Sequence, residues 1–241
     1  MDAMQQQTRR ASILHHLYPG VVITACFVAL TPRVVALGYP PQFSMLLCIV
    51  GVAIPLLLMH LRAARKKERL TSIRQLNGYT ERLPAWRLVS YSLGLVVVAF
   101  IAWGVLQPVD QLITASLLSW LPDWYTVQDF SGYGREAIIT TLVANLVLNG
   151  ILAPVVEEIY FRGYLLPRME AWGKWAFVAN AALFSLYHFW QPYIYLTLMF
   201  ALLPMTYLVW KTKDLRLGIL THCLLNLVGA LLTMAMLLGD R

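Results

Sequence analysis

Charged side chains are scarce in this sequence. Asp, Glu, Lys and Arg make up 13% of its 241 residues, whereas about 25% is usual for a soluble domain. Cysteines are also few, because only Cys26, Cys48 and Cys223 are present. All three lie in apolar stretches without a CxxC pair, so we expect small buried side chains and no disulfide. The low share of charged residues, and not the cysteine content, excludes an ordinary soluble domain.

The sequence also lacks the motifs of several common active sites. It contains no HExxH, GxSxG, Walker A or GxGxxG pattern, which argues against zincins, serine hydrolases and nucleotide-binding enzymes of those types. No apolar stretch carries repeated arginines or a run of glycines like that of a selectivity filter. A voltage sensor or an ion-selective pore is therefore not indicated.

Long apolar stretches are abundant instead. Hydrophobic residues make up 59% of the chain and the mean hydropathy is +0.63, and nearly uncharged windows of about 20 residues recur, as in polytopic membrane proteins. We expect an all-α transmembrane helical bundle. A Pro- and Trp-rich segment, 107–131, is interpreted as an interfacial or re-entrant helix, or as a short eighth span. The seven predicted spans are 14–37, 43–61, 86–106, 136–156, 174–190, 192–210 and 217–238.

The net charge of +7 is concentrated in short segments between these spans. Segment 62–87 is the most basic, and segments 157–174 and 211–216 fall on its side of the membrane, as does the amino terminus. The positive-inside rule places this side in the cytoplasm. We expect the positive charge to meet anionic lipid headgroups, and we do not expect nucleic acid as a partner.

Two adjacent carboxylates, Glu157 and Glu158, end the fourth predicted span. Glu158 and Arg162 are four residues apart, so on a helix they share a face and can form an ion pair. Glu157 points about 100° away and is free to face another group, for example as a base. The alternative is an ordinary charged helix end in water at the membrane surface.

Histidines occur in two later apolar stretches. His222 and Asn226 are four residues apart on the seventh predicted span, and together they offer donors for an oxyanion; the alternative is a hydrogen-bonded pair that joins two helices. His188 follows Phe184 by one helical turn and falls near the far end of the fifth predicted span. The alternative role of His188 is packing against aromatic side chains. The aromatic run 187–195 is interpreted as an interfacial belt.

Three sequence elements in this order resemble the signature of one family. They are Glu-Glu-x-x-x-Arg at 157–162, Phe-x-x-x-His at 184–188 and His-x-x-x-Asn at 222–226. The pattern resembles that of the CPBP or Abi family, the CAAX proteases and bacteriocin-processing enzymes, which are glutamate-dependent intramembrane proteases. The resemblance covers roughly residues 136–238, and it divides the chain into amino-terminal spans with the basic loop, 1–135, and a catalytic helical core, 136–238.

The resemblance implies a role for each matching residue. Glu157 would activate a water molecule, with His188 positioning or deprotonating it, and His222 and Asn226 would bind the oxyanion. Glu158, Arg162 and Phe184 would support these groups. The implied activity is an intramembrane endopeptidase acting on a membrane-associated peptide or protein.

Several alternatives stay open at this point. Glu157, His188 and His222 are zinc-competent ligands, although the resemblance favours a reaction without a metal and without any other cofactor. A non-catalytic immunity or scaffold protein of the same fold is one rival function, and a small transporter is another. The compact length predicts a multi-pass protein of a prokaryotic plasma (inner) membrane, with its amino terminus in the cytoplasm.

Overall fold

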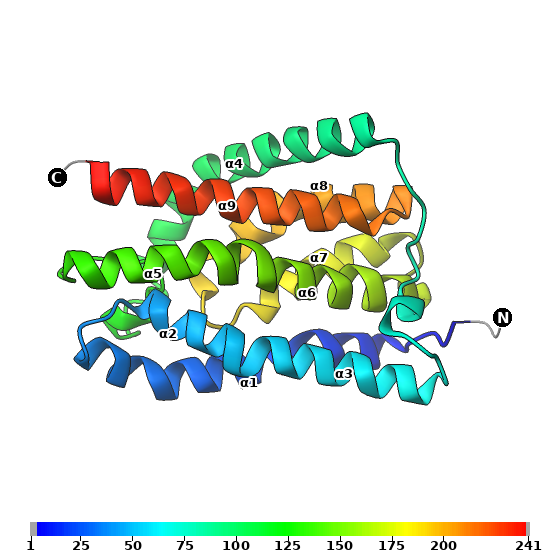
Figure 1. Ribbon diagram of the computed structural model, residues 1–241, viewed down its shortest axis with the longest axis horizontal. Coiled ribbons are helices and arrows are strands. Elements are labelled where there is room, and N and C mark those ends of the chain that lie inside the picture. The colour runs from blue at the N-terminus through cyan, green and yellow to red at the C-terminus, as the bar shows by residue number, and fades with distance from the viewer. Residues whose placement is uncertain (1–3, 240–241) are drawn as a thin grey trace.

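The computed structural model describes residues 4–239, and within them the chain is an all-α bundle without a β-strand. Figure 1 shows the long helices lying side by side along the long axis of the molecule. The α-helices are α1 Arg9–Ala36, α2 Pro41–Cys48, α3 Ile54–Lys67, α4 Ala85–Ala115, α5 Arg135–Val147, α6 Ala153–Glu158, α7 Ala176–Tyr187, α8 Tyr195–Thr212 and α9 Leu215–Gly239. The short 3-10 helices are η2 Ile73–Leu76, η3 Asp123–Tyr125, η6 Leu166–Arg168, η7 Glu170–Trp175 and η8 Pro192–Ile194, and the π-helical segments are η1 Ile49–Ala53, η4 Leu148–Leu152 and η5 Ile159–Leu165.

Six helical stretches of the described chain are long and apolar enough to cross a membrane. Many of their large apolar side chains are exposed, such as Val105 at 70% and Met236 at 68%, as expected for surfaces that face lipid. The polytopic bundle was therefore predicted correctly, but with one span too many. The six stretches are Arg9–Ala36, Pro41–Lys67, Ala85–Ala115, Arg135–Arg168, Pro192–Thr212 and Leu215–Gly239.

The predicted span 174–190 is corrected by the structure. Helix α7 has 12 residues, which at 1.5 Å per residue gives a length of about 18 Å, whereas a bilayer core is about 30 Å thick. Hydropathy missed this because the residues after the helix are still apolar. The helix ends before His188, whose φ of −80° and ψ of 52° are not helical. His188 therefore lies within the bundle, and not at the far end of a full span.

The position of the two carboxylates is also corrected. The fourth predicted span, 136–156, is part of one continuous helical stretch that runs to Arg168, so Glu157 and Glu158 do not end it. Two π-helical segments interrupt this stretch. The first, η4, ends two residues before Pro154, just as η1 ends two residues before Pro55 in α3. A proline cannot donate to the preceding turn, and a π-turn accommodates this defect.

The segment 107–131 forms neither a re-entrant helix nor an eighth span. Helix α4 continues through Pro108 to Ala115, and turns with the 3-10 helix η3 follow. These turns fold back against the connection between α7 and α8. The Tyr125 hydroxyl donates to the Phe189 carbonyl at 2.9 Å, and the Val127 amide donates to the Tyr193 hydroxyl at 3.1 Å. The segment thus supports the turn that carries His188.

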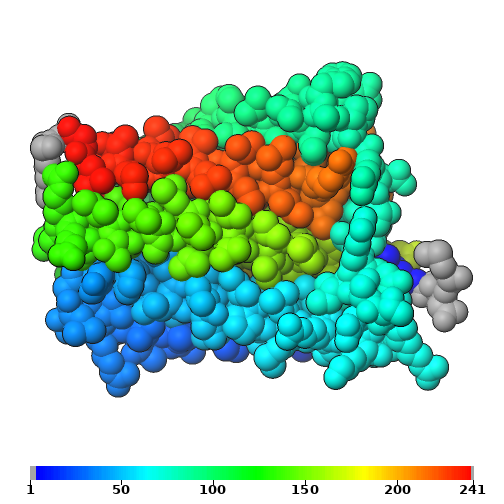
Figure 2. All heavy atoms as spheres, viewed as in Figure 1, coloured from blue at the N-terminus to red at the C-terminus, as the bar shows by residue number. Residues whose placement is uncertain are grey.

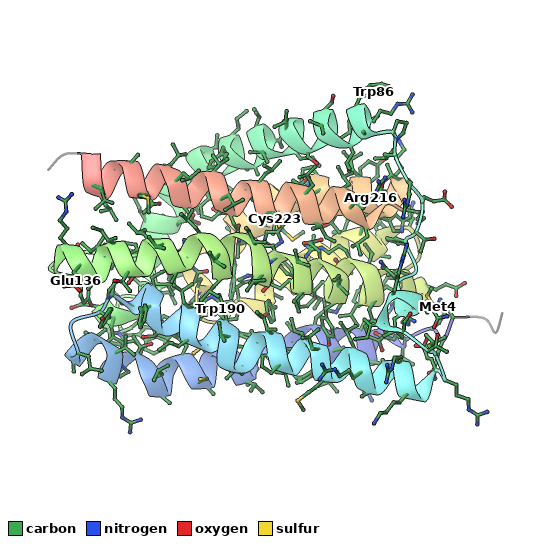
Figure 3. All side chains as sticks on the ribbon, viewed as in Figure 1. Met4, Trp86, Glu136, Trp190, Arg216 and Cys223 are labelled. Carbon is green, nitrogen blue, oxygen red and sulfur yellow. The ribbon has the colours of Figure 1, made fainter. Side chains whose placement is uncertain are left out.

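The basic segments gather at one end of the bundle, which we call the basic end. Figure 1 shows the segment between α3 and α4 crossing this end, where α9 also begins. In Figure 3, Met4, Trp86 and Arg216 lie at this end and Glu136 lies at the other. Arg168 fastens the crossing segment, because it donates to both carboxylate oxygens of Glu68 and to the Leu76 carbonyl.

Candidate active site

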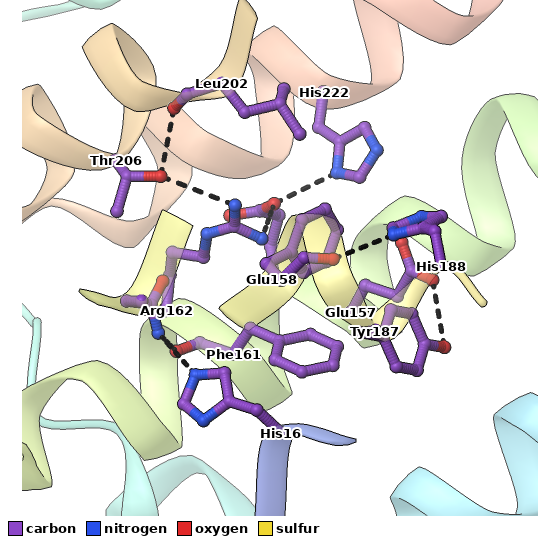
Figure 4. A network of polar contacts seen from close by, with 12 residues as sticks. His16, Glu157, Glu158, Phe161, Arg162, Tyr187, His188, Leu202, Thr206 and His222 are labelled. Carbon is purple, nitrogen blue, oxygen red and sulfur yellow. Dashed lines mark hydrogen bonds and ion pairs between the residues drawn. The ribbon is translucent and has the colours of Figure 1, made fainter. Parts of the chain in front are cut away.

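Glu158 is fully buried at the centre of a polar cluster. Its Oε1 accepts a hydrogen bond from Nη1 of Arg162 at 3.0 Å, so the ion pair expected from the four-residue spacing is present. The same oxygen lies 2.9 Å from Nδ1 of His222, on α9. Figure 4 shows the three side chains converging from two helical stretches. Glu158 therefore joins the α5–η6 stretch to α9 within the bundle.

Arg162 is held from several sides and is also fully buried. Its Nη2 donates to the Thr206 hydroxyl of α8 at 3.4 Å, and that hydroxyl in turn donates to the Leu202 carbonyl at 3.0 Å. The guanidinium lies 3.9 Å from the centre of the Phe184 ring, which is a cation–π contact. Phe184 thus supports the ion pair from below, consistent with the supporting role implied by the resemblance.

Gly218 allows α9 to approach Glu158. A Cβ atom at this position would lie 2.6 Å from Oε2 of Glu158 and 3.2 Å from a methyl carbon of Val209. Both distances are shorter than an ordinary contact, so a side chain here would push α9 away from the carboxylate. Gly218 lies one turn before His222, and it therefore sets the short distance between His222 and Glu158.

Glu157 has different surroundings, although it is the next residue along the chain. The residue is 9% exposed, and the Tyr187 hydroxyl lies 3.4 Å from its Oε1. Within residues 4–239, no basic side chain pairs with it. Figure 4 places Glu157 beside Tyr187 and His188, away from Arg162. Glu158 is therefore held by Arg162 and His222, whereas Glu157 has no basic partner among the described residues; the helical spacing predicted the pairing with Arg162.

His188 is fixed by the end of α7. Its Nδ1 lies 2.8 Å from the Phe184 carbonyl, and because a carbonyl only accepts, Nδ1 carries the proton and Nε2 is the acceptor. The rings of Phe184, Tyr187 and Trp190 surround it at centroid distances of 4.8–4.9 Å. Tyr187 and Trp190 are buried. These aromatics enclose the site, so the predicted interfacial belt was wrong for them.

Asn226 makes a contact that sequence reasoning did not foresee. Its Nδ2 donates to the backbone carbonyl of Asn149 at 2.8 Å. In the π-helical segment η4, the Ala153 amide donates five residues back, to Leu148. The next donor in this pattern would be residue 154 toward Asn149, but Pro154 has no N–H. The carboxamide of Asn226 therefore fills the place of a missing backbone donor.

Two further residues connect α1 to the site. Asn180 on α7 donates through Nδ2 to the Phe161 carbonyl at 3.0 Å and contacts Nε2 of His16 at 2.9 Å. The ring of His16 is oriented by the Ser12 carbonyl, 2.6 Å from Nδ1. Gly20 allows α1 to lie directly against the Tyr187 carbonyl. A polar residue at position 16 of an apolar span was the available signal, but nothing in the sequence pointed to Asn180 as its partner.

The zinc alternative can be tested against the arrangement of donors. Within residues 4–239, no three His, Cys, Asp or Glu side chains are placed to hold one metal ion. The Nδ1 atoms of His188 and His222 contact Phe184 and Glu158, and these contacts leave both Nε2 atoms open, as in many metal-binding histidines. No step proposed below uses a metal, and the EDTA experiment below tests whether the reaction needs one.

Comparison with known proteins identifies the region that carries this cluster. The family described as type II CAAX prenyl endopeptidase Rce1-like matches residues 139–228, which include Glu157, His188, His222 and Asn226. No curated protein and no solved structure is significantly similar to the chain. The match covers less than half of the chain and agrees with the resemblance noted from the three sequence elements. Residues 139–228 of this multi-pass membrane protein are therefore similar to the type II CAAX prenyl endopeptidase Rce1-like family.

Proposed function

We propose that the protein is an intramembrane endopeptidase that hydrolyses a peptide bond of a membrane-associated protein or peptide through a water molecule activated by Glu157. The unequal pairing of the two adjacent carboxylates carries this proposal. Glu158 is bound by Arg162 and His222, whereas the only hydrogen bond of Glu157 in the described chain comes from Tyr187. A carboxylate that no cation holds is free to accept a proton from water.

The first step forms a bond between the water oxygen and the scissile carbonyl carbon. Glu157 takes the proton of the water, and the electron pair of the carbonyl moves to its oxygen. His188 supports this step because its Nδ1–H is committed to the Phe184 carbonyl, which leaves Nε2 to accept the other hydrogen of the water. General-base catalysis of this kind contributes about 10²–10⁴-fold to a rate.

The oxyanion then needs a donor, and His222 is suited to be one. Its Nδ1 faces Oε1 of Glu158 at 2.9 Å. In the proposed reaction His222 starts with both ring nitrogens protonated, Nε2–H donates to the oxyanion without being transferred, and the carboxylate stabilises the imidazolium, as in other carboxylate–histidine pairs. Asn226 supplies the second donor through the other N–H of its Nδ2, because one N–H is donated to the Asn149 carbonyl and a carboxamide nitrogen has two. One such donor lowers a barrier by about 2.7–4 kcal/mol. Collapse of the intermediate breaks the C–N bond, and the leaving amine takes the proton from Glu157.

The match to the CAAX prenyl endopeptidase family suggests which substrate to assay first. A prenylated carboxy-terminal CAAX peptide is the substrate to assay first, and membrane-anchored leader or signalling peptides are the next. We place the basic end in the cytoplasm, because the segment between α3 and α4 and residues 211–216, around the α8–α9 connection, both carry several Lys or Arg side chains there. This orientation puts the amino terminus in the cytoplasm, and we propose that the membrane is a prokaryotic inner membrane.

The test compares purified wild-type protein with Glu157→Gln in proteoliposomes that contain a farnesylated CAAX peptide, with cleavage followed by mass spectrometry. Membrane proteomes of cells that carry either form extend the test to precursors of unknown sequence. Glu136→Gln is the matched control, because Glu136 is exposed at the opposite end of the bundle. Glu157→Gln should accumulate uncleaved precursor, and EDTA should leave wild-type cleavage unchanged. Equal cleavage by both forms would overturn the proposal.

A further inference from the structure

A second hollow lies at the basic end, outside the polar cluster. Its volume is about 380 Å³, and it lies between the segment that links α3 to α4, the segment η5 and the start of α9. Figure 2 shows the linking segment as a strap of atoms across the ends of the helices. Binding pockets for small ligands have volumes of roughly 300–1,000 Å³. The hollow is therefore large enough for part of an amphiphile.

Apolar side chains form the inner wall of this hollow. Leu61 comes from α3, Ile159 from η5 and Ile219 from α9, while Ile73 and Leu76 come from the crossing segment. Ile159 and Ile219 are only half-buried. The apolar wall is thus open to an occupant, and it continues the apolar surfaces of three helices that cross the membrane.

Basic groups line the opening. Arg74 and Arg82 are exposed and make no ion pair within the described residues. Arg216 is already bound to Asp214 at 2.6 Å, so these two charges cancel. Glu81 is the remaining acid of the lining. The opening therefore has an excess of positive charge and two guanidinium groups without an acidic partner.

The anchoring of the crossing segment shows that the hollow is built into the fold. The Gly78 amide donates to the Gly163 carbonyl at 3.0 Å, and the Leu83 amide donates to Oδ2 of Asp214 at 2.7 Å. Leu76 is 1% exposed and Tyr79 is 6% exposed. The segment is thus anchored between Arg74 and Arg82 and again directly after Arg82, which fixes the hollow beneath it.

The hollow does not face the carboxylate that we propose as the base. Ile159, in its wall, follows Glu157 by two residues on a continuous helix. Two residues correspond to about 200° of rotation, so the two side chains lie on opposite faces. A peptide bond at Glu157 would not occupy this hollow. Its occupant is a separate molecule that combines an anionic group with an apolar chain.

We propose that the hollow binds an anionic membrane phospholipid, with its phosphate at Arg74 and Arg82 and an acyl chain against Ile159 and Ile219. Each Lys or Arg near an anionic lipid contributes about fivefold to binding, because about 1 kcal/mol per residue converts to that factor. Removal of both guanidinium groups should therefore weaken retention by about 25-fold. The site is independent of proteolysis, so Glu157→Gln should bind the lipid as well as the wild type.

Native mass spectrometry of the full-length protein in detergent tests this proposal, with dioleoyl-phosphatidylglycerol and dioleoyl-phosphatidylcholine as the two probes. Wild-type protein should retain phosphatidylglycerol in preference to phosphatidylcholine. The double variant Arg74→Gln/Arg82→Gln and the cavity-filling variant Ile219→Trp should lose it. Arg62→Gln/Lys66→Gln is the control, because both residues are exposed on α3 and are not part of the lining.

Three results would overturn the assignment. The first is equal retention by the double variant and by its control. The second is equal retention of the two lipids by the wild type, which would remove the role of the headgroup charge. The third is full displacement by soluble glycerol phosphate, which would make the hollow an anion site without an acyl chain. Unchanged thermal unfolding of Arg74→Gln/Arg82→Gln would show that loss of lipid is not loss of fold.

Discussion

His222 contacts Glu158, and not the neighbouring Glu157, through its Nδ1 at 2.9 Å. Arg162 approaches the same oxygen of Glu158 at 3.0 Å, so one carboxylate receives both basic groups of the cluster. Two adjacent acids on one helix therefore have different partners, because their side chains leave the helix about 100° apart. The arrangement predicts that the two positions respond differently to the same substitution.

Glu158→Gln should destabilise the fold more than Glu157→Gln does. Removal of one partner from a buried ion pair leaves the other charge uncompensated and costs about 3–5 kcal/mol, and here Arg162 would be left. Glu157 has no basic partner among the described residues, so replacing its carboxylate with the carboxamide of Gln should change the free energy of unfolding little. Thermal unfolding of both variants in the same detergent measures the difference. Equal destabilisation would contradict the division of roles.

His222→Ala should lower kcat/KM for peptide cleavage by about 10²–10³-fold, which is the effect of removing one oxyanion donor. Glu158 keeps its ion pair with Arg162 in this variant, so membrane insertion and yield should be near normal. Cys223→Ala, the adjacent position on α9, is the control and should retain activity. A variant at His222 with wild-type kcat/KM would exclude it from the reaction.

Gly218→Ala should destabilise the protein by about 1–3 kcal/mol, although alanine is the better helix former by about 1 kcal/mol. The added Cβ would lie 2.6 Å from Oε2 of Glu158 and would separate α9 from the carboxylate. Gly229→Ala on the same helix has nothing within 4 Å of its Cβ, and it should be neutral or stabilising. The opposite signs of the two changes in melting temperature are the test.

The spacing of residues was enough to foresee the core of the cluster. On any helix that includes residues 157–162, Glu158 and Arg162 share a face and Glu157 points to a different one. Hydropathy also located the six stretches that can cross a membrane. These features depend on local periodicity and composition, which a single sequence contains in full.

Other features depend on contacts between distant segments and were missed. Composition cannot show that α7 stops before His188, because the following residues Phe189 and Trp190 are as apolar as a membrane helix. The contact of Asn180 with His16 joins residues 164 positions apart. The π-turn before Pro154 was also unforeseen. The carbonyl of Asn149 in this turn accepts its hydrogen bond from Asn226, a tertiary contact that the sequence does not reveal.

The anchoring of the crossing segment should weaken in acid. Burial alone would raise the pKa of Asp214, but hydrogen bonds from Arg216 and from the Leu83 amide outweigh it and hold the pKa below its ordinary value of 3.8. A folded-state pKa below the unfolded one gives stability that is complete above the unfolded pKa and lost as pH falls through the folded one. The melting temperature of the wild type minus that of Asp214→Asn should be constant above about pH 5 and should shrink below about pH 4. A constant difference down to pH 3 would contradict this.

Asn226 has two roles that a double-mutant cycle can separate. Its Nδ2 lies 2.8 Å from the Asn149 carbonyl, which lacks a backbone donor because residue 154 is proline. Asn226→Ala should therefore cost about 1 kcal/mol of stability, the lower end of the penalty for an unsatisfied carbonyl, because this one is only partly buried. In a Pro154→Ala background, the new amide of residue 154 can supply the missing donor. The same Asn226→Ala substitution should then cost clearly less stability.

The values of kcat/KM measured for the same four proteins test the catalytic role of Asn226. If Asn226 is an oxyanion donor, Asn226→Ala should lower kcat/KM by a similar factor in both backgrounds, because Pro154→Ala restores the carbonyl's partner but not the lost donor. If Asn226 only satisfies the π-turn, Pro154→Ala should restore kcat/KM together with stability. Unfolding midpoints and cleavage rates from the four proteins, wild type, two single variants and the double variant, decide between these outcomes.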